Sequence, residues 1–193
     1  MTRALDMAAG WLKRGRPVLA VFRDARGVSA IEFALIAPVL LVLYVGTVEI
    51  GNVLTIDRRV ALVGSTAADL VAQKKTTSNS DLNDVGNAAK SILTPYSTSP
   101  LKIVLTSVVA DQNNKGKVAW SYGYNGGSAR AKDSSYTVPE GLTQANSSVI
   151  VAEVTYNFSP LLNLSGLPNP GFFKMSSTFY ARPRKSLTVN KTD

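Results

Sequence analysis

The residues with the clearest chemical potential surround a glycine near the amino terminus, in the stretch RDARGVSAIEF at positions 23–33. Gly27 lacks a Cβ, so its backbone can enter a protease groove in an extended form, and a plain helix-breaking glycine is the other interpretation. Five positions later, Glu32 lies at the start of an apolar run. A carboxylate there is costly and usually paired, unless it simply reaches the headgroup layer of a membrane. These residue types permit cleavage by another enzyme at the glycine and ion pairing at the glutamate.

The rest of the residue inventory excludes most enzyme chemistry. The 193 residues include no cysteine and no histidine, which removes disulfides, thiolate metal sites, Ser-His-Asp triads, Cys-His pairs and zinc-activated water. The acids between positions 85 and 192 are not paired at ligand spacing and form no Asp-rich calcium loop. They are Asp111, Asp133, Glu140 and Glu153. We therefore expect neither an enzyme nor a cofactor or metal site.

The net charge of +8 is concentrated in front of the apolar run. Residues 1–27 carry six basic and two acidic side chains, a balance of +4 and half of the excess. Cationic flanks of this kind stay on the cytoplasmic side of a membrane helix. The distribution thus predicts a cytoplasmic amino terminus rather than a surface that binds nucleic acid.

The apolar run itself predicts a transmembrane helix. Residues 33–48, FALIAPVLLVLYVGTV, carry no charge and cover roughly 24 Å as a helix, against a hydrocarbon core of about 30 Å. The expected span therefore extends over residues 28–51 and has Glu32 and Glu49 near its two ends. A secretory signal peptide is the alternative, but its charged region would be long and no Ala-x-Ala site follows Val48.

The junction resembles the processing site of type IV pilins and pseudopilins, in which a charged leader ends at a glycine and a glutamate follows five positions later. The string AIEFALIAP at positions 30–38 is more specifically similar to TadE-like minor pilins of tight-adherence (Flp-type) pili. In that family a small-x-Glu-Phe-Ala-Leu core is followed by a proline and a leucine-rich run. Glu49 matches a glutamate commonly found after that run. The strong resemblance covers roughly residues 23–51.

The resemblance implies cleavage after Gly27 by a prepilin peptidase, so that Val28 becomes the first residue of the mature protein. It implies further that the new amino group pairs with Glu32, and that Glu32 and Phe33 set the axial register of a filament. Pro38 removes one backbone donor and is expected to bend the helix. The implied partners are the peptidase, other pilin subunits, membrane lipid and the inner-membrane assembly machinery of a Tad-type pilus.

Beyond the membrane, the sequence predicts an amphipathic continuation of the helix over residues 52–75 and an α+β head over residues 76–193. A second helix is expected from Asp81 to Leu93. Four strand-like runs follow, at residues 101–110, 117–124, 148–158 and 172–182. A roughly four-stranded antiparallel sheet covered on one face by the long helix is the arrangement that pilins use.

Two further motifs lie in the head. Trp120, Tyr122 and Tyr124 alternate along one face of a predicted strand, and we interpret them as core packing rather than as a surface for a partner or carbohydrate. The stretch RPRK at positions 182–185 resembles an ending seen in some TadE-like chains, but we interpret it mainly as a solvated basic tail.

Together these features predict a non-enzymatic minor pilin (pseudopilin) that crosses the bacterial inner membrane once. Residues 1–27 would be a cytoplasmic leader, and the head would lie in the periplasm until the subunit enters an extracellular pilus that serves surface adhesion. The alternative is an unprocessed, membrane-anchored periplasmic binding or scaffold protein. The mass of the intact chain distinguishes the two, because only the pilin begins at Val28.

Overall fold

The computed structural model describes residues 25–112, 115–160 and 173–193, and these residues form two compact units. The first ends at Val48 and the second runs from Glu49 to Asp193. One helix, α2 (Ala25–Ala72), contributes to both. The long helix predicted from about Ser29 to Lys74 is thus confirmed, although it begins four residues earlier. Apart from its last residues, the predicted leader lies outside the described residues.

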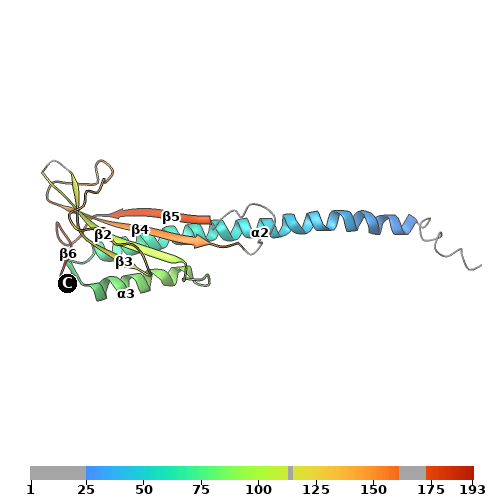
Figure 1. Ribbon diagram of the computed structural model, residues 1–193, viewed down its shortest axis with the longest axis horizontal. Helices are drawn as coiled ribbons and strands as arrows, with labels where there is room; N and C mark the ends of the chain where they lie inside the picture. The colour runs from blue at the N-terminus through green and yellow to red at the C-terminus, as the bar shows by residue number, and fades with distance from the viewer. Residues whose placement is uncertain (1–24, 113–114, 161–172) are drawn as a thin grey trace, which may run out of the picture. The chain divides into compact units, whose positions relative to one another are not determined.

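The second unit is built on a four-stranded antiparallel sheet (Figure 1). Its strands are β2 (Leu101–Ala110), β3 (Gly116–Tyr124), β4 (Ser148–Phe158) and β5 (Phe173–Ala181). They are arranged in the order β3-β2-β4-β5, so the two central strands are those richest in fully buried apolar residues. Each strand lies within one residue of its predicted bounds, because period-2 alternation and flanking turn residues mark strands strongly.

One face of the sheet packs on the carboxyl-terminal part of α2. Ile103 of β2 is opposite Val154 of β4, and both are fully buried together with helix residues such as Val60. The helix approaches the sheet closely at Gly64, where a Cβ would come within 2.5 Å of the Phe179 ring. A side chain at this position would force helix and sheet apart, so the close packing requires glycine.

A shorter helix, α3 (Asn79–Lys90), continues into a 3-10 turn at Ser91–Leu93 and lies against the same core. It begins two residues before the predicted start because Ser78 and Asp81 form a capping box. Arg59 of α2 holds the other end, donating to the carbonyl oxygens of Ile92 at 2.7 Å and Thr94 at 2.5 Å.

The aromatic residues of β3 belong to this core, as expected. Trp120 and Tyr124 are buried, and Tyr122 is packed against the same cluster. The polar atoms of the two buried rings both have partners, since the Trp120 indole donates to the Val189 carbonyl and the Tyr124 hydroxyl donates to Asn87. Interpreting the alternating aromatic residues as core packing is therefore confirmed.

The last described residues pair with the segment that follows α2, and the sequence analysis did not predict this strand pairing. β1 (Thr76–Thr77) and β6 (Asn190–Lys191) form a parallel two-stranded sheet. The Asp193 carboxylate accepts hydrogen bonds from the backbone N–H of Asn79 at 2.9 and 3.0 Å, at the amino-terminal end of α3. The segment between α2 and α3 thus anchors the carboxyl-terminal residues.

Candidate functional site

The amino-terminal part of α2 exposes apolar side chains on every side. Val28 is 53% exposed, Leu35 72% and Tyr44 72%, and the large aliphatic residues between them are similarly exposed. In the described part of the chain, α2 is the one helix long and apolar enough to cross a membrane. A helix with no polar face is covered in its working state by lipid or by other helices, so this segment is a candidate membrane anchor.

The polar groups of the anchor are largely satisfied within the helix. Backbone groups pair along the helix, and the Thr47 hydroxyl donates to the Leu43 carbonyl at 2.8 Å. Pro38 has no N–H, so it cannot donate to the carbonyl of Ala34, although α2 continues through it as one helix. The bend expected at Pro38 stays a prediction. These features lower the cost of placing the segment in hydrocarbon.

The expected processing junction lies in the first turn of α2. Because the helix begins at Ala25, the peptide between Gly27 and Val28 is helical rather than extended. A Cβ built on Gly27 would meet no atom within 4 Å, and Val28 is exposed, so the described residues leave this turn open to another protein. Binding in a protease groove would require only this first turn to unwind.

Glu32 follows Val28 by four positions, so the helix places both residues on one face. The side chain of Glu32 is exposed, as is that of Phe33 beside it in sequence, and no described residue forms an ion pair with Glu32. Glu32 therefore lies one helical turn after Val28, close enough for its carboxylate to pair with a charged group at that position.

The remaining predicted acid, Glu49, is not brought together with this junction. It lies 17 positions after Glu32 on α2 and is half-buried at the start of the second unit. The residues expected to act in processing and register are thus gathered in the first two turns of α2, whereas Glu49 belongs to the head.

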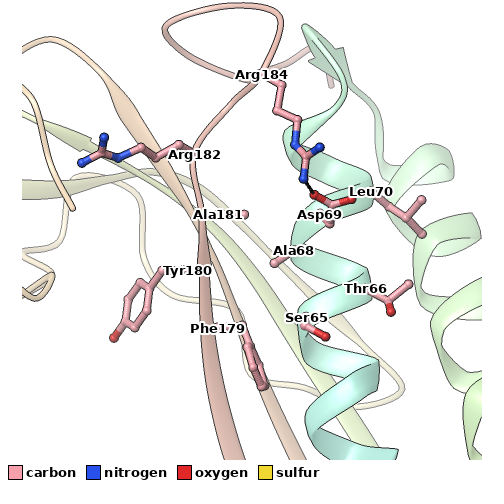
Figure 2. A pocket seen from close by; sticks show the side chains of 10 residues that line it. All are labelled: Ser65, Thr66, Ala68, Asp69, Leu70, Phe179, Tyr180, Ala181, Arg182 and Arg184. Carbon is pink, nitrogen blue, oxygen red and sulfur yellow. Dashed lines mark hydrogen bonds and ion pairs between the residues drawn. The ribbon is translucent and has the colours of Figure 1, made fainter.

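The basic stretch at 182–185 proves to be more than a solvated tail. A cavity of about 530 Å³ lies between α2 and β5. Arg184, one of its lining residues, pairs with Asp69 there (Figure 2). The Arg184 backbone N–H also donates to the Ala72 carbonyl, and the Arg182 guanidinium donates to the carbonyl oxygens of Gly141 and Leu142. Sequence reasoning missed these contacts because Asp69 is 115 positions from Arg184 and no local pattern joins them.

These features define a pilin-like α+β protein, in which an apolar amino-terminal helix runs on into a helix packed on a four-stranded antiparallel sheet. Residues 27–69 match the family model described as TadE-like protein. This segment runs from the candidate processing glycine into the part of α2 that packs on the sheet, and over it the chain is similar to TadE-like proteins, as the motif predicted. No curated protein and no solved structure matches the chain.

Proposed function

We propose that this chain is a minor pilin of a Tad/Flp-type pilus, held in the bacterial inner membrane by α2 until it enters the filament. The observation that carries the proposal is the outward-facing apolar segment 28–48, with one carboxylate near its start, inside the stretch similar to TadE-like proteins. Such an apolar surface must be shielded from water on every side. Membrane lipid shields it before assembly, and the helices of neighbouring subunits pack around it in the filament.

Processing after Gly27 by a prepilin peptidase is part of the proposal. Cleavage removes the basic leader and creates an ammonium group on Val28. A cation at the amino-terminal end of a helix is disfavoured by the helix dipole, and the carboxylate of Glu32 one turn later offsets that cost. The same carboxylate can instead accept the ammonium group of a neighbouring subunit, which would fix the axial register, with Phe33 packing beside it.

The proposed topology follows the charge distribution. The basic leader stays in the cytoplasm, α2 crosses the inner membrane, and the head lies in the periplasm until assembly. The partners are then the peptidase, other pilin subunits and the Tad-type assembly machinery. The assembled pilus serves surface adhesion.

The mature amino terminus tests this proposal. Mass spectrometry of protein extracted from native membranes and pili is expected to find a chain that begins at Val28. Gly27→Val is expected to keep the chain at full length, because the added side chain obstructs the protease groove. Gly46→Val is the matched control, since Gly46 also lies in the apolar part of α2 with no atom within 4 Å of an added Cβ. Residues 1–27 retained in assembled pili would overturn the proposal.

A second candidate is a single-pass anchored binding or scaffold protein that keeps its leader. The observation that favours it is the helical state of the junction, because a peptidase must unwind the first turn of α2 before it can cleave. In that case the extracted protein begins before residue 28 and is absent from sheared pilus fractions, and Gly27→Val changes neither result.

A further inference from the structure

The described residues cover the outer face of the sheet, opposite α2, only in part. The connection between β3 and β4 reaches over it, and Arg130 forms a two-pronged ion pair with Glu153 of β4, at 3.0 and 2.6 Å. Beside this pair, a depression of about 450 Å³ lies open over β2, β4 and β5. Its walls are the turn at Gly126–Ser128 on one side and the exposed side chains of β5 on the other.

The lining of this depression combines two lysines with neutral hydrogen-bonding groups. Lys102 is opposite Thr155, Thr155 is opposite Ser176, and Lys174 is opposite Asn157. Lys102 and Lys174 thus lie on a diagonal of the sheet, two strands and two residues apart, or about 12 Å between their Cα atoms. Both long side chains are exposed and can reach the same small group above Thr155.

The charge of the depression is an excess of two cations. Its one acidic residue, Glu153, is already neutralised by Arg130, whose guanidinium also stacks 4.8 Å from the centre of the Tyr136 ring. The hydrogen bond to Glu153 raises the pKa of Arg130, as expected for a fixed pair. Lys102 and Lys174 form no ion pair with any residue in the described ranges.

The turn beside the lysines is held in place by close backbone packing. Gly126 has a φ of +76°, and a Cβ on Gly127 would come within 2.5 Å of the Ile103 carbonyl, so both positions require glycine. The Lys102 Cε lies 3.9 Å from where a Cβ would stand on Gly126. The end of the Lys102 side chain therefore lies beside this turn.

We propose that this depression binds an anionic group carried by a polysaccharide. The two ammonium groups would hold a phosphate or carboxylate, and the hydroxyl and amide groups around them would bond to sugar hydroxyls, which donate and accept in the same way. The depression is open to solvent, so a chain longer than the bound unit can extend beyond it. The site lies in the head and does not depend on processing at Gly27.

Binding of the full-length chain in detergent to three dextrans, at about 0.15 M salt, tests the proposal. The probes are carboxymethyl dextran, phosphorylated dextran and uncharged dextran. We expect the chain to bind one or both acidic dextrans, and the preferred one identifies the anion. Equal binding to uncharged dextran, or tighter binding to single-stranded RNA than to either acidic dextran, would overturn the proposal.

Paired variants separate this site from the general positive charge of the head. Lys102→Gln combined with Lys174→Gln is expected to weaken binding about tenfold, as the loss of two exposed ion contacts would. Lys115→Gln combined with Lys117→Gln removes the same charge from exposed positions elsewhere and is expected to leave binding within about twofold. Equal losses in both double variants would overturn the proposal, and unchanged melting temperatures would show that all variants are folded.

Discussion

The two parts of α2 differ in whether the rest of the chain buries their apolar side chains. In the part up to Val48, most large apolar side chains are more than half exposed within the described chain. From Ile56 onward, the buried residues recur on one face, and they include Ile56, Val60, Val63, Ala67 and Val71. The sheet buries the apolar face of the head part of α2, whereas the apolar surface of the anchor part must be covered by lipid or by other chains.

This contrast indicates how the two parts respond to substitution. Burial inside the chain contributes to the folding free energy, so changes on the inner face of the head part alter stability. Changes in the anchor part alter insertion into the membrane and packing with other subunits, because that surface is covered only there. The same substitution placed in each part can therefore separate folding from assembly.

The largest expected effect comes from a buried charge. Val63→Asp places a carboxylate at a position that is 0% exposed between α2 and the sheet, and we expect it to unfold the head or destabilise it by more than about 4 kcal/mol. Val42→Asp, at a position that is 53% exposed in the anchor, is the matched variant. Its expected cost is about 3 kcal/mol for membrane insertion, with the melting temperature of the head unchanged. Circular dichroism and membrane fractionation measure the two effects. A folded head in Val63→Asp would contradict the packing described above.

The next effect concerns register in the filament. Glu32→Ala removes the carboxylate that faces the proposed ammonium group, and we expect cleavage to continue while incorporation into pili falls about tenfold, as for one lost ion pair at a helix end. Glu32→Gln keeps the shape of the side chain and is expected to show the same loss. Immunoblots of sheared pili and membranes measure the ratio. Cleaved Glu32→Ala subunits at normal levels in pili would show that Glu32 does not set the register.

Much of this contrast was predictable from the sequence, because the two parts carry different local patterns. The anchor lacks amphipathic periodicity, the head part of α2 regains it, and alternation marks β2 and β4 to the residue. Processing between Gly27 and Val28 stays a prediction that rests on residue spacing and family resemblance. The start of α2 at Ala25 was not predicted, because the sequence analysis expected Gly27 to separate the leader from the helix.

Contacts between distant segments were also beyond prediction. The pairing of β1 with β6 joins strands of two residues each, which are too short to show alternation. Asp69 and Arg184 meet only because α2 and the end of β5 pack side by side, and neither residue has a distinctive local pattern (Figure 2). The lining of the outer sheet face likewise depends on strand order, which single-strand patterns do not fix.

A smaller effect is expected where the end of β5 is joined to the helix. Arg184→Ala removes the ion pair with Asp69 but keeps the backbone hydrogen bond to Ala72, so we expect a loss below about 1 kcal/mol. The side chains are 65% and 39% exposed, and water therefore screens the pair. A double-mutant cycle with Asp69→Ala, followed by urea unfolding, measures the coupling. A coupling free energy above about 2 kcal/mol between Arg184 and Asp69 would show that water does not screen this ion pair.

The smallest effect is a pH dependence at the start of α3. The hydrogen bond from Lys74, together with those from Ser78, lowers the pKa of Asp81 from 3.8 to about 2. A carboxyl group whose pKa is depressed by folding stabilises the folded state above its unfolded pKa, and this contribution is lost as the pH falls through the folded value. The melting temperature of the wild type should therefore exceed that of Asp81→Asn at pH 7, and the difference should shrink between about pH 4 and pH 2.

The control for this prediction is Asp84→Asn, because Asp84 is an exposed acid on the same helix. This variant is expected to keep the pH dependence of the wild type. A difference between wild type and Asp81→Asn that stays constant from pH 7 to pH 2 would mean that the capping geometry stabilises α3 without the charge of Asp81.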